Sequence, residues 1–425
     1  MQKELFELEA QKYKRPLIEG SLPFNRVRQE NWDFKGAMAS TDVYGIHPYP
    51  AMFHFLLVRE LINSFSTEGD TILDPFLGSG VTAVESAINN RTFIGFDINP
   101  LAVLITKVRT TPLPQRLVLE TLDEIERNTR RTAPEAVTFH NIDFWFDEII
   151  IASLSQLRQA LFAVADEKMR DFFKVVFSEV VRRVSKTSYN EFKLVREKKP
   201  QPAANVSGTF REVALKNIGL LSEFYRKQPV FESSLSLYNH NILDSGIIPD
   251  QTIDLVVTSP PYGDSKTTVA YGQFSRLSLR WLGLEETVDR TSLGGKAKEI
   301  TSTLPSPILY EYLEKIARKD EKRAREVFAF YDDLFDAVKT IAEKVKPSGH
   351  ICFVVGNRTV KGEQLPTDKI SADFFAHAGC WHKKTAVRAI LNKRMPSENS
   401  PSNIAGQKNS TMRFEYIVVL EKRRC

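Results

Sequence analysis

The chain has 425 residues, of which 42% are hydrophobic and 26% are charged, so composition excludes a disordered or fibrous protein. Charges begin at Lys3 and no apolar run approaches the ~20 residues of a bilayer span, so we expect neither an export signal nor a membrane segment. Three cysteines, at positions 352, 380 and 425, match no metal-binding or disulfide spacing, which favours a cytoplasmic protein without a metal site.

Short β-branched and aromatic runs predict strands at residues 71–76, 92–99, 236–243, 252–259, 350–357 and 414–421. Apolar positions at helical spacing predict a helix between the first two strands and another that ends near Pro347 and Gly349. Because these strands lack polar alternation and alternate with helices, the sequence predicts an α/β fold with a doubly wound, mostly parallel sheet covered on both faces.

Residues 111–234 interrupt this pattern with 3.6-residue periodicity, which predicts a helical insertion whose segment 195–210 is an exposed loop. Two stretches are basic: residues 182–227 contain eleven Lys or Arg against four Glu, and residues 374–397 contain five with no acidic residue. Each stretch either lies against phosphates or forms an ordinary solvated surface, and charge patterning leaves both interpretations open.

The first predicted strand ends in Asp74 and runs through a tight loop with Gly78 and Gly80 into a helix. Glycines there let the backbone approach a ligand at the carboxyl end of a strand, and Asp97 at the end of the next strand can accept hydrogen bonds from both hydroxyls of a ribose. A purely structural turn remains an alternative, with Asp97 capping it.

The same loop, read with Ala83, also fits the fingerprint of an NAD-dependent dehydrogenase. Asp74 argues against that alternative, because a carboxylate before the first glycine repels a pyrophosphate and suits a ligand with an ammonium and a sulfonium.

A second loop follows the strand at residues 252–259 and contains Ser259, Pro260, Pro261 and Tyr262. The prolines remove two backbone donors, so the strand tip offers mainly acceptors, the Ser259 hydroxyl and the Pro260 carbonyl, which suit an amino group. Tyr262 offers a stacking face for a base taken out of a duplex. A rigid turn without chemistry is the alternative.

Together, DPFLGSG, DIN and TSPPY resemble the motifs of the amino-methyltransferases of bacterial restriction and modification systems. The resemblance implies a Rossmann-like class I methyltransferase fold that binds S-adenosylmethionine and needs no metal. It also implies that Asp74, Phe76, Gly78 and Gly80 hold the methionine part of that cofactor, that Asp97 holds its ribose, and that residues 259–262 hold the target amino group. Two further segments match, and they add His47, Pro48, Phe53 and Asp244 to the implied cofactor site.

A carbon-5 methyltransferase requires a nucleophilic cysteine, usually after proline, and none of the three cysteines has that context. Direct attack of an amino nitrogen on the sulfonium methyl remains. In the family that the motifs resemble, serine at the first motif position usually marks N4 of cytosine, while aspartate or asparagine marks N6 of adenine. N6 of adenine and an RNA base stay open as alternatives. The implied partners are double-stranded DNA with a flipped base and a companion restriction endonuclease.

The predicted organisation is an N-terminal segment (1–43), a first core part with the cofactor motifs (44–110), the insertion (111–234) and a second core part with the catalytic loop (235–425). The cofactor motif precedes the catalytic loop, unlike the commonest N4-cytosine arrangement, which leaves the target-recognition segment open. Candidate DNA contacts lie in the insertion and directly after the catalytic loop; they are Lys193, Arg196, Lys198, Lys199, Lys266, Thr267 and Arg276.

Overall fold

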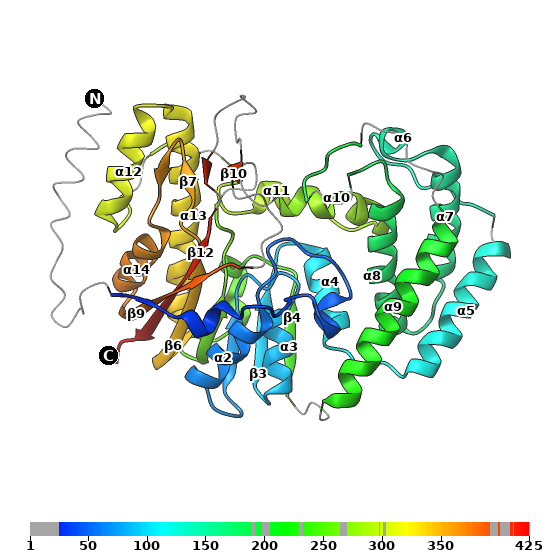
Figure 1. Cartoon of the computed structure of the whole chain (residues 1–425), viewed down its shortest axis with the longest axis horizontal. Helices are drawn as coiled ribbons and strands as arrows, with labels where there is room; N and C mark the ends of the chain where they lie inside the picture. Colours follow the sequence, from blue (N-terminus) through cyan, green and yellow to red (C-terminus); the bar gives the residue numbers. More distant parts are fainter. Residues whose placement is uncertain are drawn as a thin grey trace.

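The structure is a computed structural model that describes residues 25–131, 133–188, 192–197, 205–228, 233–263, 270–296, 298–300, 303–391, 398–399, 409–410 and 412–424. Within these ranges the molecule has two halves, a sheet flanked by helices and a bundle made of the insertion (Figure 1). No helix in the described part is long and apolar enough to cross a bilayer.

The central sheet has eight strands within the described residues. Their order is β1 (Arg26–Arg28), β9 (Cys380–Ala389), β12 (Phe414–Lys422), β6 (Val345–Val355), β5 (Ile253–Thr258), β2 (Thr71–Asp74), β3 (Thr92–Phe96) and β4 (Leu235–Tyr238). Strand β12 is antiparallel to both neighbours, and the other pairs are parallel. This confirms the predicted doubly wound, mostly parallel sheet of the Rossmann-like class I methyltransferase type.

Strand order reverses between β2 and β5, where Ile72 lies opposite Leu255 in a parallel register. Open α/β sheets bind their ligands at such a switch point, outside the carboxyl ends of the strands. Both candidate loops start there, since β2 ends at Asp74 and β5 ends at Thr258.

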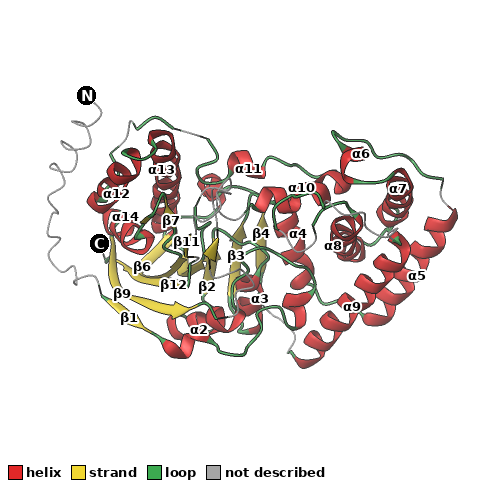
Figure 2. Cartoon of the chain, turned by 45° about the horizontal axis from the view of Figure 1, so that its top comes forward, coloured by secondary structure: helices red, strands yellow, loops and turns green. Residues whose placement is uncertain are grey.

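Helices cover both faces of the sheet (Figure 2). One face buries Leu73, Val256 and Phe353 against α12 (Pro307–Ala317), α13 (Glu321–Lys344) and α14 (Thr367–His377). The other buries Ile72 and Leu255 against α2 (Phe55–Phe65), α3 (Val81–Ile88) and α4 (Pro100–Arg109). Neighbouring strand residues thus point to opposite apolar layers, which explains why the strands carry no polar alternation.

The insertion forms α5 (Gln115–Arg131), α6 (Ile142–Trp145), α7 (Glu148–Phe162), α8 (Glu167–Val184) and α9 (Val206–Lys227). The prediction of an exposed loop at residues 195–210 is wrong from residue 206 onward. Asn205 caps α9 instead, because its side chain accepts a 2.9 Å hydrogen bond from the Gly208 amide. The insertion shares one apolar core with α4 and with α10 (Tyr271–Leu282), so it is not a separately folded module.

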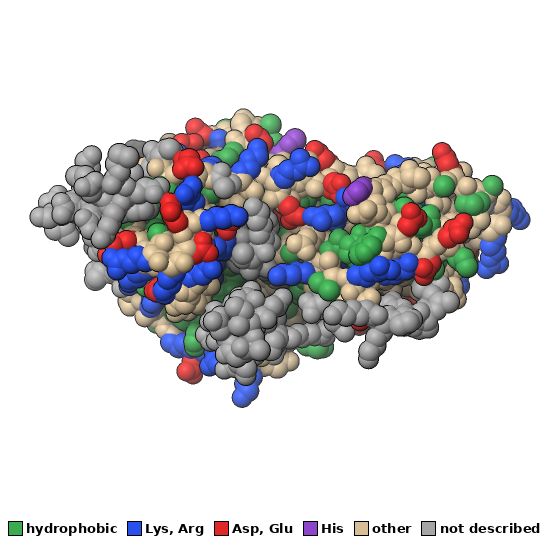
Figure 3. Space-filling view, turned by 90° about the horizontal axis from the view of Figure 1, so that it is seen from above, with side chains coloured by type: hydrophobic (Ala, Val, Ile, Leu, Met, Phe, Trp, Pro, Cys, Tyr) green, Lys and Arg blue, Asp and Glu red, His purple; other side chains and the backbone are tan. Residues whose placement is uncertain are grey.

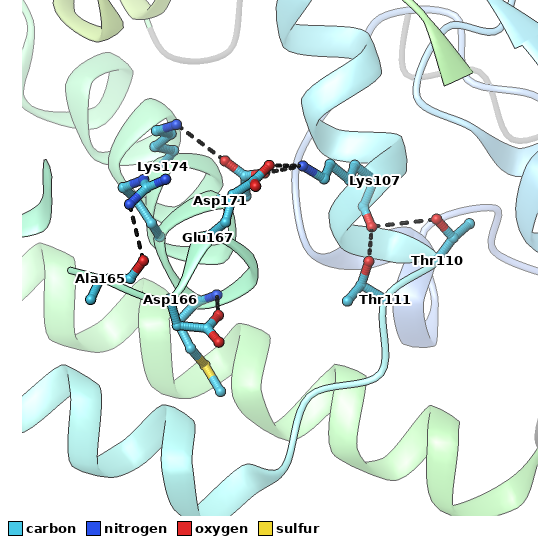
Figure 4. A network of polar contacts seen from close by, with 10 residues as sticks. Lys107, Thr110, Thr111, Ala165, Asp166, Glu167, Asp171 and Lys174 are labelled. Carbon is cyan, nitrogen blue, oxygen red and sulfur yellow. Dashed lines mark hydrogen bonds and ion pairs between the residues drawn. The ribbon is translucent and has the colours of Figure 1, made fainter. Parts of the chain in front are cut away.

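Polar contacts add to this junction between α4 and α8 (Figure 4). The Lys107 ammonium lies 2.6 Å from Glu167 and 2.8 Å from Asp171, and Lys174 lies 3.1 Å from the same Asp171 carboxylate. Two residues after Lys107, the buried Arg109 donates 2.6 Å to the Ser79 carbonyl. Helix α4 therefore links the insertion to the glycine loop.

Several short elements complete the described fold. They are η1 (Glu30–Asp33), η2 (Asp42–Gly45), η3 (Ile242–Ile247), α11 (Val288–Thr291), β7 (Thr359–Val360), β8 (Glu363–Gln364), β10 (Glu398–Asn399) and β11 (Asn409–Ser410).

Candidate active site

A pocket opens at the carboxyl ends of β2, β3, β4 and β5. Its volume is about 1030 Å³ when the space at its mouth is included. Because that volume includes open solvent at the mouth, the residues that line the pocket define the site better than its size does. Its wall brings together residues of both candidate loops and of the upstream segment: Phe53, Phe76, Gly78, Asp97, Ser259 and Pro261.

The glycine loop depends on backbone conformations that favour glycine. Gly78 and Gly80 have φ angles of +51° and +80°. A Cβ atom on Gly80 would lie 2.3 Å from the Thr106 hydroxyl oxygen, so α4 packs directly onto the loop. Gly78 lines the pocket, whereas Gly80 lies outside the wall and starts α3.

Asp97 lies in the pocket wall at the end of β3. Its carboxylate accepts hydrogen bonds of 2.7 Å from the Gly78 amide and 2.8 Å from the Asn99 amide. Burial raises the pKa of Asp97 to about 7, and the two amides counteract part of that rise. A carboxylate held this way still has lone pairs for the hydroxyls of a ribose.

Asp74 lies behind the pocket wall. Its carboxylate accepts a 2.6 Å hydrogen bond from the Thr258 hydroxyl and a 3.1 Å bond from the Phe76 amide. Burial raises the pKa of Asp74 to about 6, and these bonds lower it. Direct contact between Asp74 and a cofactor stays a prediction. The two hydrogen bonds of Asp74 join the glycine loop to the end of β5.

The upstream segment contributes Tyr49 and Phe53 to the wall, and His47 and Pro48 lie outside it. His47 is buried, with Nδ1 2.6 Å from the Pro48 carbonyl oxygen and Nε2 2.9 Å from the Ser178 hydroxyl. Burial lowers the pKa of His47 to about 3, so the ring is neutral. His47 therefore connects this segment to helix α8 of the insertion.

Sequence reasoning placed Asp244 in the cofactor site, and the structure places it in η3 with an exposed side chain outside the pocket wall. The wall near the end of β4 consists of His240, Asn241 and Ile242. A contact between Asp244 and the cofactor remains a prediction.

The candidate catalytic loop places Ser259 and Pro261 in the wall, whereas the buried Pro260 and the half-buried Tyr262 lie outside it. The Ser259 hydroxyl donates 3.2 Å to the Tyr262 hydroxyl, which donates 3.1 Å to the carboxylate of Glu415 on β12. Burial raises the pKa of Tyr262 well above its usual value near 10, so the phenol keeps its proton. Glu415 belongs to no recognisable motif, and sequence reasoning missed it.

Comparison with known proteins identifies the family. A DNA methylase family profile matches residues 1–108. The chain is 38% identical over 408 residues to the Type II methyltransferase M.MvaI of Kocuria varians, covering 88% of this chain and 90% of that protein. The chain belongs to the DNA amino-methyltransferase family.

Two weaker likenesses accompany these matches. The methyltransferase is 23% identical over 389 residues to the Type II methyltransferase M.BsoBI of Geobacillus stearothermophilus, covering 76% of this chain and 75% of that protein. The crystal structure of a SAM-dependent methyltransferase from Methanosarcina mazei aligns with a TM-score of 0.32 and 10% identity, over 89% of this chain and 99% of that one.

Family membership makes S-adenosylmethionine the methyl donor and DNA the substrate, and it removes the dehydrogenase alternative. The pocket fits that donor. Phe53 and Phe76 provide apolar wall, the loop around Gly78 allows close approach, and Asp97 offers a carboxylate for the ribose hydroxyls.

The candidate DNA contacts of the methyltransferase divide into three groups. Lys193 and Arg196 are exposed, and the Arg196 guanidinium lies 4.5 Å from the centre of the Phe144 ring. Arg276 is half-buried and pairs with Asp289 at 2.6 Å. The remaining four lie outside the described residues: Lys198, Lys199, Lys266 and Thr267.

The two basic stretches differ from a bare phosphate-binding surface. In the first, Arg183 pairs with Glu179, Arg211 with Glu126, and Lys227 with Glu223. The second stretch contains strand β9, which sequence reasoning missed and which carries three of its five basic residues, Lys383, Lys384 and Arg388. Viewed from above, Lys and Arg are spread over both halves of the molecule and interspersed with Asp and Glu (Figure 3).

Proposed function

We propose that this methyltransferase transfers the methyl group of S-adenosylmethionine to N4 of cytosine in double-stranded DNA. The observation that carries the proposal is that Asp97 and Ser259 line one pocket although 162 positions separate them in the sequence. One side of the pocket suits a ribose and the other an amino group, so donor and acceptor can meet there.

The chain's own residues supply binding and orientation. Asp97 accepts hydrogen bonds from the ribose, and the aromatic wall around Phe53 and Phe76 excludes water. When bound, S-adenosylmethionine supplies a methyl group activated by a positive sulfur. The Ser259 hydroxyl oxygen and the Pro260 carbonyl accept hydrogen bonds from the two amino N–H groups, which favours a pyramidal nitrogen whose lone pair can attack the methyl carbon. The bond between that carbon and sulfur breaks as the bond to nitrogen forms, and the methylated nitrogen then releases one proton.

A covalent cysteine mechanism is disfavoured by the surroundings of two of the three cysteines. Cys352 and Cys380 are buried in the sheet. Burial raises the pKa of Cys380 to about 11 and that of Cys352 further, so neither forms a thiolate readily. This supports direct transfer to nitrogen.

Serine at position 259 supports cytosine over adenine, and N6 of adenine is the second candidate because the matching profile is that of a DNA methylase of the N6/N4 type. An RNA base is a weaker alternative. Relatives named Type II methyltransferases support a role in restriction and modification, with a companion endonuclease that acts on the same site. Such a role would place the enzyme in the cytoplasm.

The test is to incubate the purified protein with duplex DNA and labelled S-adenosylmethionine, digest the DNA and identify the labelled nucleoside by mass spectrometry. The proposal predicts N4-methyldeoxycytidine, and a matched incubation with RNA should remain unlabelled. Labelled N6-methyldeoxyadenosine would select the second candidate. Absence of label from DNA would contradict both.

A further inference from the structure

The Tyr262 hydroxyl makes contacts that base stacking does not explain. Stacking on a nucleobase requires only an aromatic ring. Here the hydroxyl group bridges Ser259 at 3.2 Å and Glu415 at 3.1 Å. A Cβ atom on Gly356, directly after β6, would lie 1.9 Å from the Met412 sulfur and 2.9 Å from the Tyr262 ring, so both side chains use the space that the glycine leaves.

Glu415 lies at the far end of this chain of hydrogen bonds, beside an arginine. Strands β12 and β9 place it directly opposite Arg388, whose Nε lies 3.3 Å from the second carboxylate oxygen, an ion pair without hydrogen-bond geometry. The Glu415 side chain is 20% exposed and that of Arg388 is 5% exposed. The carboxylate is therefore fixed by the sheet and largely shielded from water.

The direction of the hydrogen bonds follows from the chemistry of the three groups. An ionised carboxylate only accepts, so Tyr262 must donate its single proton to Glu415. The Tyr262 oxygen then accepts, and the single proton of Ser259 is donated to it. The Ser259 oxygen is left with lone pairs toward the pocket whose wall it forms.

We propose that Glu415 is a positioning residue for methyl transfer: it sets the direction of the Ser259–Tyr262 hydrogen bonds so that the Ser259 oxygen accepts a hydrogen bond from the target amino group. This inference rests on the proposed function. The raised pKa of Tyr262 is consistent with it, because the phenol keeps the proton that it donates.

Replacing Glu415 with glutamine tests whether the direction of these hydrogen bonds matters for methyl transfer. Arg388 can only donate, so the glutamine oxygen should face Arg388 and the amide N–H should face Tyr262. Tyr262 then donates to Ser259, and the Ser259 proton points toward the amino group from which Ser259 should accept a hydrogen bond. We expect the single-turnover rate of DNA methylation to fall about 10- to 100-fold, the range of a hydrogen bond to a charged group, while cofactor and DNA dissociation constants stay unchanged. Tyr262→Phe keeps the ring and the Glu415–Arg388 pair, and it should slow transfer to a similar extent.

The matched control is Glu421→Gln. Glu421 lies on the same strand, has the same 20% exposure and pairs with Lys383 of β9 at 2.9 Å. The Glu421→Gln enzyme should methylate DNA at the wild-type rate. The double variant Glu415→Gln/Tyr262→Phe should be no slower than the slower of the two single variants, because both substitutions break the same chain of hydrogen bonds.

A Glu415→Gln enzyme that methylates DNA at the wild-type rate would overturn the inference. So would a double variant whose loss of rate is the product of the two single losses, or a loss of rate that weaker cofactor binding explains. A wild-type protein that leaves DNA unmethylated would instead contradict the proposed function on which the inference rests.

Discussion

The Thr258 hydroxyl donates a 2.6 Å hydrogen bond to the buried carboxylate of Asp74. This bond joins the ends of β2 and β5, from which the cofactor loop and the catalytic loop start. Since Ser259 is the next residue after Thr258, the bond couples the position of this proposed catalytic serine to the glycine loop.

Thr258→Val should therefore lower the free energy of unfolding by about 1 to 3 kcal/mol, because it leaves a buried carboxylate with one donor fewer. Thr258→Ser keeps the hydroxyl and serves as the control. Chemical denaturation of the three proteins measures the effect, and equal stability of the valine variant and the wild type would show that the bond contributes nothing.

Asp97→Ala removes the pocket carboxylate that we propose binds the ribose. Two hydrogen bonds to a charged group are lost, so binding of S-adenosylmethionine should weaken by about 2 to 4 kcal/mol. Isothermal titration calorimetry measures this directly. Asp244→Ala, at the exposed position outside the pocket wall, tests the other predicted cofactor carboxylate in parallel. Unchanged affinity of the Asp97 variant would remove Asp97 from the cofactor site.

Asp97 should also make the free enzyme less stable as pH rises. Its pKa rises from 3.8 to about 7 on folding, so between these values the folded state binds more protons than the unfolded state and stability falls with increasing pH. Asp74, with a pKa of about 6, acts in the same direction, whereas His47, with its pKa lowered to about 3, acts in the opposite direction.

The informative quantity is therefore the difference in stability between the Asp97→Asn variant and the wild type. The variant lacks the titrating group, so its stability relative to the wild type should increase from pH 4 to pH 7 in the absence of cofactor. Melting temperatures across that range provide the measurement. A difference that does not change with pH would contradict the raised pKa.

The insertion should contact DNA through its exposed basic residues. Neutral replacement of Lys193 and Arg196, together with Lys198 and Lys199, should make the slope of log affinity against log salt shallower by ~0.9 per lost phosphate contact. Arg211→Gln is the control, because its guanidinium already pairs with Glu126. An unchanged slope with normal methylation would place the DNA surface in the competing segment, residues 263–329.

The parts that could be predicted from the sequence are those with a strong local signal. The apolar strands at 71–76 and 252–259 and the motifs around Gly78 and Ser259 required only periodicity and turn chemistry. Because parallel strands end at one edge, the meeting of Asp97 and Ser259 in one pocket also follows from that pattern.

The missed parts depend on contacts distant in sequence. Strand β9 contains Lys383, Lys384 and Arg388, and its basic character conceals a strand whose charges pair with glutamates of β12. Glu415 carries no motif and gains its place beside Tyr262 only through the register of β12. His47 matched a cofactor motif, yet its ring packs toward Ser178 of the insertion, which no local pattern indicates.

The most direct test of the central claim, that Ser259 accepts the target amino group in the pocket that holds the cofactor, is a single-turnover measurement on Ser259→Ala. The account predicts that methyl transfer to DNA falls by about 100-fold or more, the cost of removing one group that stabilises a transition state, while calorimetry shows wild-type affinity for S-adenosylmethionine. A Ser259→Ala enzyme that methylates DNA at the wild-type rate would contradict it.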